Sequence, residues 1–262
     1  TSTITFTIDS VAPNLNITSP VANKTNTTDI NLDILFNFSD VTLTPDSCWY
    51  SNDTFTVANL SLGSGGFCNN ITNITWSQGT HALRLYVNDT VNNLNTSTLT
   101  FTVDNVAPSL NITSPLNRTN SSDNLLDILY NFSDATLTPD SCWYSNDTFS
   151  VANYSLGSGG FCNNITNITW SEGTHNVRIY VNDTLGNLNS SHVLFVIDTA
   201  FPQLNITNPS QNNTNTTNFD LDVNFSASDN VFLSSCWYSN DSFGMNTTIT
   251  CGQNITNINW TD

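Results

Sequence analysis

Apolar and polar residues alternate along most of this chain, which is the spacing of half-buried β-strands. In residues 1–9, Ile4, Phe6 and Ile8 fall on one face and threonines on the other. The same alternation returns at 99–104 and 193–198, and in longer runs at 32–38, 126–132 and 219–225. No stretch of useful length has the 3.6-residue period of an amphipathic helix. The pattern predicts an all-β protein.

One module recurs along the chain. The motif Cys-Trp-Tyr-Ser-Asn-Asp occupies 48–53, 142–147 and 236–241, at intervals of about 94 residues, the size of a small domain. Each copy contains roughly seven short strand-like runs, which is typical of a Greek-key β-sandwich. We expect residues 1–9 to be the last strand of a preceding domain, followed by domains at 10–104, 105–198 and 199–262. The third lacks its last strands, which favours a window cut from a longer tandem polypeptide.

The joints between modules are short and contain Pro13, Pro108 or Pro202. Proline fixes its own φ and restricts the preceding residue, so neighbouring modules should be held end to end. The run from Trp170 to Asn187 and the joint from Asp104 to Pro108 resemble the immunoglobulin-like repeats of bacterial and archaeal surface proteins. The Cys-Trp-Tyr-Ser variant with heavy Asn and Thr usage is similar to archaeal examples. This resemblance implies tandem Ig-like domains in stalks, adhesins or surface layers.

Each module has two of the six cysteines, so the repeat predicts the disulfides Cys48–Cys68, Cys142–Cys162 and Cys236–Cys251. Closing a loop of roughly 15–20 residues would stabilise each module by about 3 kcal/mol. Buried free thiols are the alternative, and zinc is disfavoured because no CxxC pair or paired histidines accompany the cysteines. Persistent disulfides indicate a location outside a reducing cytosol, at the cell surface or beyond it.

Charge excludes one class of partner. The chain has 4 Lys+Arg against 21 Asp+Glu and a formal net charge of −17. Neutralising phosphates requires a basic patch, so nucleic acid is not an expected partner. No apolar run approaches the roughly 18–20 residues of a membrane span.

Asparagine-linked glycosylation is the strongest functional signal. The chain has about 28 Asn-x-Ser/Thr sequons, although its Asn and Thr content would produce many by coincidence. Several recur at one position of the module and are expected to point outward, as for Asn37, Asn131 and Asn224. The predicted glycosylation sites are Asn16, Asn37, Asn52, Asn70, Asn73, Asn88, Asn111, Asn131, Asn146, Asn164, Asn167, Asn182, Asn205, Asn224, Asn240 and Asn254.

No catalytic residues and no catalytic cofactor are predicted. His81 and His175 recur at a turn before a strand, which favours a structural role, and no Ser-His-Asp arrangement is evident. Two roles are compatible with the positions of Trp49, Trp143 and Trp237: covering a sheet face or a loop, and stacking on sugars or a neighbouring subunit. Aspartates at the joints, Asp9, Asp104 and Asp198, could bind interdomain calcium with Asp40 or Asp134, although no EF-hand or RTX spacing is present.

Two functional classes follow. The first is a structural element of an extracellular filament, stalk or surface layer, which self-associates and carries covalent glycans. The second is an adhesin or carbohydrate-binding protein that uses the same rod for reach. Donor-strand exchange, in which residues 1–9 complete a neighbouring subunit as in pilus assembly, is an alternative route to a polymer.

Overall fold

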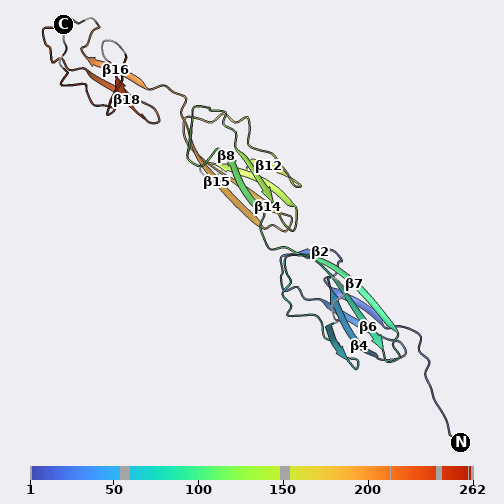
Figure 1. Cartoon of the computed structure of the whole chain (residues 1–262). Coiled ribbons are helices and arrows are strands. Elements are labelled where there is room, and N and C mark those ends of the chain that lie inside the picture. Colours follow the sequence, from blue (N-terminus) through green and yellow to red (C-terminus); the bar gives the residue numbers. More distant parts are fainter. Residues whose placement is uncertain are drawn as a thin grey trace.

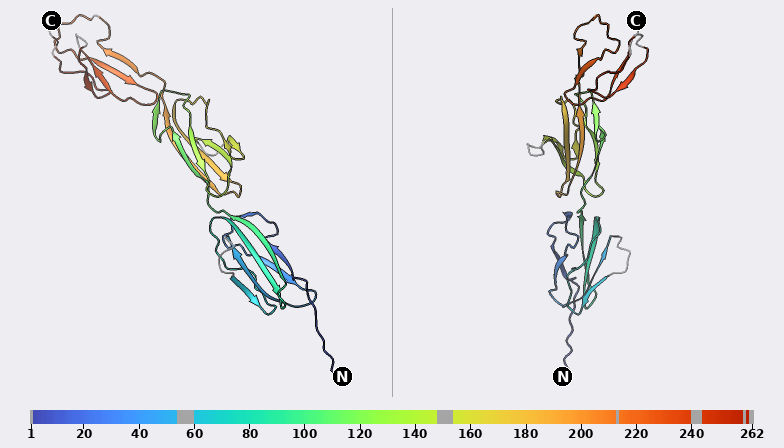
Figure 2. Two further views of the ribbon diagram at one scale, coloured as in Figure 1. Left: turned by 45° about the vertical axis from the view of Figure 1, so that its right-hand side comes forward. Right: turned by 90° about the vertical axis from the view of Figure 1, so that its left-hand side faces the viewer.

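The computed structural model describes residues 2–53, 60–147, 154–212, 214–239, 244–258 and 260. Within these ranges the secondary structure consists of strands and no helix, so the all-β prediction is confirmed. Figures 1 and 2 show three β-sandwiches in tandem, joined end to end by short connections. No helix in the described ranges is long and apolar enough to span a membrane.

The first sandwich comprises β1 to β7. Its smaller sheet pairs β1 with β3, and its larger sheet has the order β2-β7-β6-β4-β5. The pairs β4–β6 and β6–β7 are antiparallel, whereas the short β2 runs parallel to β7. The strands are β1 (Asn14–Ser19), β2 (Thr25–Thr27), β3 (Leu35–Ser39), β4 (Pro45–Asn52), β5 (Leu60–Ser64), β6 (Gly79–Asp89) and β7 (Leu94–Val103).

The second sandwich, β8 to β15, repeats this topology. It pairs β10 with β8, and its larger sheet has the order β13-β12-β11-β14-β15-β9. The strands are β8 (Ser109–Ser114), β9 (Thr119–Ser121), β10 (Leu129–Ser133), β11 (Pro139–Asn146), β12 (Tyr154–Ser158), β13 (Phe161–Cys162), β14 (Gly173–Asp183) and β15 (Leu188–Ile197).

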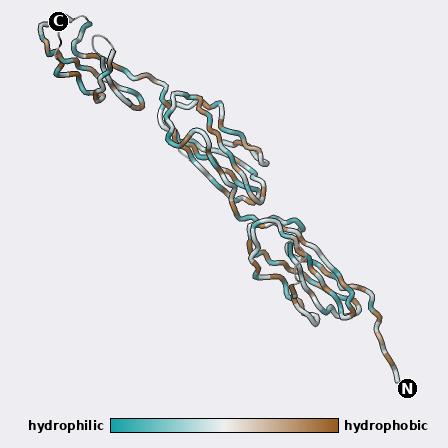
Figure 3. Tube along the Cα trace, viewed as in Figure 1, coloured by the Kyte–Doolittle hydropathy of each residue, from teal (hydrophilic) through white to brown (hydrophobic). Residues whose placement is uncertain are grey.

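Strict alternation places the core between the two sheets. In β14, the buried residues Val177, Ile179 and Val181 alternate with partly exposed neighbours. They share one buried cluster with Phe195 of the neighbouring strand β15 and with Ile128, which directly precedes β10 of the smaller sheet. The hydropathy tube in Figure 3 shows the same alternation of apolar and polar residues along the strands. Each of the first two sandwiches therefore has its own core, and the first is built from equivalent residues.

The third sandwich is more open. Its strands β16 (Gln203–Asn208), β17 (Asn224–Ser228), β18 (Cys236–Tyr238) and β19 (Thr247–Ile249) form two separate two-stranded sheets. Leu204 is 68% exposed, where its counterparts Leu15 and Leu110 pack against a core. A cavity of about 650 Å³ between the sheets is lined by Leu204, Ile206, Phe225 and Ile249. The residues that fill this space in the other sandwiches lie on β6, β7, β14 and β15.

Two sequence-based predictions differ from the structure. Residues 2–9 form no strand here, and Ile4, Phe6 and Ile8 are 86%, 81% and 79% exposed. An alternating segment becomes a strand only when a neighbouring strand supplies hydrogen bonds, and these residues pair with none. The run predicted at 32–38 is also shorter, because β3 begins at Leu35 and Ile34 joins Ile71 through an isolated bridge.

Candidate metal centre at the joints

Each of the first two joints is held by the same side-chain contacts. At the second joint, Asn187 Nδ2 donates to the backbone oxygen of Asp104 at 3.0 Å, and Asn189 Nδ2 donates to that of Pro108 at 2.9 Å. At the first joint, Asn93 and Asn95 donate equivalently to Asp9 and Pro13, at 3.3 and 2.8 Å. The residues at the start of β7 or β15 therefore bind the chain segment that enters their own sandwich.

Three carboxylates meet at the second joint. Asp104 directly follows β7 of the first sandwich, while Asp134 follows β10 and Asp183 ends β14 of the second. Each residue offers one carboxylate oxygen, and the three oxygens lie within 4.8 Å of one another. Asp104 and Asp183 are 0% and 1% exposed. The cluster, which we call the second acidic joint, thus combines residues from both sandwiches in a largely dry setting.

Local turns fix one oxygen of each carboxylate. Asp183 Oδ1 accepts hydrogen bonds from the backbone of Leu185 and Asn187, at 2.8 and 3.0 Å. Asp134 Oδ1 accepts hydrogen bonds from the backbone N–H groups of Thr136 and Leu137. Asp104 Oδ1 accepts one from Val106 at 3.2 Å. Aspartate commonly organises turns in this way. The second oxygen of Asp104, Oδ2, is buried and has no hydrogen-bond partner.

The first joint repeats the arrangement with Asp9, Asp40 and Asp89, whose offered oxygens also lie within 4.8 Å of one another. We call this cluster the first acidic joint. Asp89 is 0% exposed, and the Oδ2 atoms of Asp9 and Asp40 are buried without a hydrogen-bond partner. Two separate joints therefore carry three acids at equivalent positions of the repeat, and Asp40 follows β3 and Asp89 ends β6 as Asp134 follows β10 and Asp183 ends β14.

Electrostatics differ between the buried carboxyls. Burial, followed by the nearby charges of Asp134 and Asp183, raises the pKa of Asp104 above its ordinary value. Burial also acts to raise the pKa of Asp89, but hydrogen bonds from Asn93 and the neighbouring backbone outweigh it, and this pKa is lowered. Among the described residues the two ion pairs join His81 to Asp53 and His175 to Asp147, so neither involves an acidic joint.

The third joint has two of the three acids. Asp229 Oδ1 accepts from the backbone of Val231 and Phe232, the same turn that Asp134 makes. Asp198 Oδ1 is buried without a partner. The possible calcium ligands Asp9 and Asp40 meet at the first joint, and Asp104 and Asp134 meet at the second. Asp89 and Asp183 were not predicted, because each is the middle residue of an Asn-Asp-Thr sequon and was interpreted only as part of that motif.

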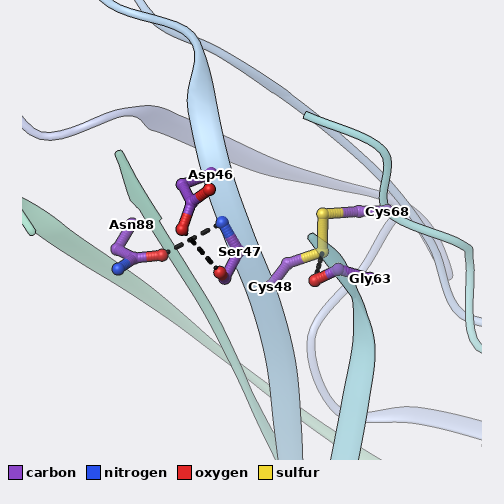
Figure 4. Close-up of a disulfide and its surroundings, with 6 residues drawn as sticks. All are labelled: Asp46, Ser47, Cys48, Gly63, Cys68 and Asn88. Carbon is purple, nitrogen blue, oxygen red and sulfur yellow. Dashed lines mark hydrogen bonds between the residues drawn. A yellow bond between two sulfur atoms is a disulfide. The ribbon is translucent and has the colours of Figure 1, made fainter. Parts of the chain in front are cut away.

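The structure contains all three predicted disulfides. Cys48 bonds to Cys68, Cys142 to Cys162 and Cys236 to Cys251, with Cα–Cα distances of 6.1, 5.9 and 5.1 Å. Figure 4 shows the first of these linking β4 to the segment after the glycine turn. Every cysteine is paired, so none is available as a thiol ligand or nucleophile.

The predicted glycosylation sites divide into two structural groups. In the first, Asn16 pairs with Asn37 across β1 and β3, and Asn111 pairs with Asn131 across β8 and β10. All four side chains are exposed, and no hydrogen bond joins them to another part of the described chain. Asn205 on β16 is likewise exposed. These asparagines stand on the outer face of the smaller sheet, where attached sugars have room.

In the second group the asparagine side chain has a structural role. The Oδ1 atoms of Asn70, Asn164 and Asn254 accept the backbone N–H of Phe36, Tyr130 and Phe225, at 2.9, 3.1 and 3.1 Å. The recurrence of these asparagines therefore has an explanation besides glycosylation. A glycan is attached through Nδ2 and would leave the Oδ1 acceptor in place.

Asn88 and Asn182 belong to the second group as well. Their Oδ1 atoms accept the backbone N–H of Ser47 and Ser141, each at 3.1 Å, and Figure 4 shows the nitrogen of Asn88 turned away from Ser47. Asn73 and Asn167 have positive φ, which asparagine tolerates better than most residues. Asn52 and Asn146 are half-buried at the ends of β4 and β11, and Asn240 lies outside the described residues.

One predicted equivalence is wrong. Asn224 was grouped with Asn37 and Asn131, but it pairs with Asn208, whereas Ser226 pairs with Asn205. The backbone N–H of Phe225 also donates to Asn254 Oδ1, as the backbone N–H of Phe36 donates to Asn70 Oδ1. Asn224 thus lies two residues earlier than the Asn37 position and is half-buried. The tripeptide Asn-Phe-Ser occurs at both places and gave the wrong alignment.

The histidines and tryptophans of the repeat pack within their own sandwich. His81 is 6% exposed, with Nδ1 3.1 Å from Asp53 Oδ1 and Nε2 2.9 Å from the backbone oxygen of Ser77. Trp49 stacks on Tyr86 with ring centroids 5.4 Å apart, on the outer face of the larger sheet. His175 and Trp143 repeat these contacts, whereas Trp237 is 58% exposed.

Comparison with known proteins found distant similarities to solved structures. No family model matches the chain, and no curated protein matches it. Fibronectin(III)-like modules of Clostridium thermocellum CbhA are 15% identical, with 70% of this chain and 93% of that chain covered and a TM-score of 0.34. Extracellular cadherin domains 3–6 of protocadherin gamma B2 are 14% identical, covering 95% and 70%, with a TM-score of 0.40. These similarities concern the β-sandwich fold alone.

Proposed function

We propose that this chain is a structural component of an extracellular, N-glycosylated surface filament, stalk or surface layer. The observation that carries the proposal is the recurrence of the joint. Asn93 and Asn95 at one joint and Asn187 and Asn189 at the next make the same contacts to the entering chain. Repetition of one contact set gives neighbouring sandwiches one relative orientation, which is what a long, regular element requires.

Surface chemistry supports the same role. Charged residues make up 10% of the chain, so few side chains provide charge-based solubility. The exposed pairs Asn16–Asn37 and Asn111–Asn131 would place two glycans side by side on each smaller sheet. Such sugars would hydrate the surface and shield strand edges from pairing with other chains. The three disulfides favour an oxidising, extracellular location.

Electron microscopy of native surface material tests the proposal, with an antibody to this chain as the label. Labelled regular filaments or a lattice would support it, whereas label confined to the cytosol would refute it. Mass spectrometry of the same material should find hexose-containing peptides at Asn16, Asn37, Asn111 and Asn131. Unmodified peptides at all four positions would refute the part of the proposal that concerns glycosylation.

An adhesive or carbohydrate-binding role is the second candidate. Trp237 is 58% exposed and is the observation that favours it, since a free indole face can stack on a sugar ring. Trp49 and Trp143 each have one indole face stacked on a tyrosine of the same sheet. Quenching of tryptophan fluorescence by oligosaccharides, lost in Trp237→Ala and retained in Trp143→Ala, would favour this role. No catalytic activity is proposed.

Donor-strand exchange is a second route to assembly. Ile4, Phe6 and Ile8 are exposed with strand spacing, and the third sandwich has an apolar cavity of about 650 Å³. In the first two sandwiches the equivalent apolar residues, on β7 and β15, fill the core. Concentration-dependent polymers that vanish in Phe6→Asp but persist in Thr5→Asp would support this route. A chain that stays monomeric at all concentrations would exclude it.

A further inference from the structure

The acidic joints bring several carboxylates together in a buried setting, where water cannot screen their charges. At the second joint, Asp104, Asp134 and Asp183 offer oxygens within 4.8 Å of one another, and two of the three residues are fully buried. Like charges at this separation repel strongly away from water. No described ion pair brings a basic side chain to either joint. A buried cluster of this kind calls for a cation.

The hydrogen bonds leave oxygens available for that cation. Turns fix Oδ1 of Asp104 and Asp134, while Oδ2 of Asp104 is buried and accepts nothing. At the first joint, Oδ2 of Asp9 and Oδ2 of Asp40 are likewise buried and have no hydrogen-bond partner. Buried polar atoms in folded proteins nearly always have a partner, so the recurrence of one unpartnered oxygen, Oδ2 of Asp9 and of Asp104, at two independent joints points to a ligand.

We propose that each of the first two acidic joints binds one Ca²⁺ ion. All the offered ligands are carboxylate oxygens, which hard cations prefer and zinc does not. Oxygens bound to one Ca²⁺ at about 2.3–2.6 Å can lie up to about 4.6–5.2 Å apart, so oxygens within 4.8 Å of one another can share one ion. Mg²⁺ loses its water ligands reluctantly and demands near-ideal octahedral geometry, so a cluster of protein carboxylates suits Ca²⁺ better.

The ion would link two sandwiches directly. Asp104 directly follows β7 of the first sandwich, whereas Asp134 follows β10 and Asp183 ends β14 of the next sandwich. Shared coordination would fix the joint far more firmly than the amide contacts of Asn187 and Asn189 alone. Calcium would then control the stiffness of the tandem array, and its removal would leave mutually repelling carboxylates at each joint.

Calorimetric titration of the chelator-treated full chain with calcium chloride tests the proposal. The expected result is two ions per chain, with dissociation constants on the order of 10⁻⁴–10⁻³ M. Magnesium chloride should bind more weakly. The absence of calcium uptake up to about 10 mM would refute the proposal.

Asp134→Asn is the informative variant because its amide oxygen can still accept the two backbone hydrogen bonds that shape the loop. It should reduce the stoichiometry to one ion, and Asp40→Asn with Asp134→Asn should abolish binding. Asp127→Asn, an exposed acid outside the joints, is the matched control and should still bind two. Undiminished binding by the double variant would overturn the assignment.

Thermal unfolding provides a readout that separates binding from misfolding. Without calcium, Asp134→Asn should melt at or above the wild-type temperature, because one of three repelling charges has been removed. With calcium, the wild-type melting temperature should rise by more than that of the variant. A variant that melts lower than wild type both with and without calcium, by the same amount, would indicate a purely structural role and would contradict the proposal.

Discussion

The indole Nε1 of Trp170 donates a 2.9 Å hydrogen bond to the backbone oxygen of Leu126, 44 residues earlier in the chain. Trp76 makes the same bond to Leu32, and Trp260 makes it to Leu221. Trp170 is 4% exposed and packs edge-on against Phe195 with ring centroids 5.1 Å apart. One side chain therefore fills the core and satisfies a carbonyl group of the segment that leads to β10.

Trp170→Phe should destabilise the second sandwich by about 1–3 kcal/mol, because a carbonyl group loses its donor in a buried setting. Denaturant unfolding followed by near-ultraviolet circular dichroism measures the loss. Trp143→Phe is the control, since Trp143 lies on the outer sheet face and a phenyl ring can still stack on Tyr180. Its cost should stay below about 1 kcal/mol. Equal losses in the two variants would contradict this role for Trp170.

Gly157→Ala should be severely destabilising. Gly157 has a φ of 142°, and a Cβ there would lie 2.0 Å from the backbone oxygen of Phe161, beside the disulfide at Cys162. We expect a loss of about 3 kcal/mol in unfolding free energy. Gly159→Ala also carries a positive φ, of 65°, but its Cβ would meet nothing within 4 Å. Its smaller loss, about 1 kcal/mol, isolates the effect of the collision.

Tyr130 predicts a loss of stability in alkali. Burial raises the pKa of Tyr130 to about 12, and its hydroxyl donates to the backbone oxygen of Asn163 at 2.9 Å. In the unfolded chain a tyrosine hydroxyl ionises near pH 10. The stability contributed by the buried, neutral Tyr130 is therefore fully present below about pH 10 and is lost as the pH rises towards 12. Stability measured between pH 8 and pH 12 should fall less in Tyr130→Phe. Phe36 occupies the equivalent place in the first sandwich, so the variant should fold.

Asn164 and Asn131 should respond differently in protein made without glycans. Asn164→Ala removes the acceptor for the backbone N–H of Tyr130 and should cost about 1 kcal/mol. Asn131→Ala removes an exposed side chain and should change stability by less than about 0.5 kcal/mol. Chemical unfolding of both variants measures the difference. If the two losses were equal, the division of the sequons into structural and outward groups would fail.

The sequence predicted the features that depend on local periodicity and on the repeat. Alternation identified the strands that contain Leu99, Phe101 and Val103, and the pairing of cysteines within modules predicted Cys48–Cys68. These features are visible in one dimension because each strand shows its buried face every second residue. The spacing between copies of the module then indicated which cysteines pair with each other.

Features that depend on the meeting of distant segments were predicted less well. Asp104, Asp134 and Asp183 are up to 79 residues apart (183 − 104 = 79), and only the folded joint shows that all three converge. The register of β17 was misassigned because Asn224 and Asn37 share a tripeptide but not a hydrogen-bond partner. The sequence also did not show that Asn70 and Asn88 accept backbone hydrogen bonds, because a sequon asparagine looks the same whether its side chain faces solvent or binds the backbone.

The disulfide within each sandwich also bears on how the chain behaves under load. When a tether is pulled from both ends, an unfolding domain releases its contour length, roughly 3.4 Å for each residue. The bond between Cys48 and Cys68 spans 20 residues, as does that between Cys142 and Cys162, and these residues cannot be drawn out. Each rupture would therefore release about 70 Å less chain than in the reduced protein, so a row of such sandwiches would lengthen less under load.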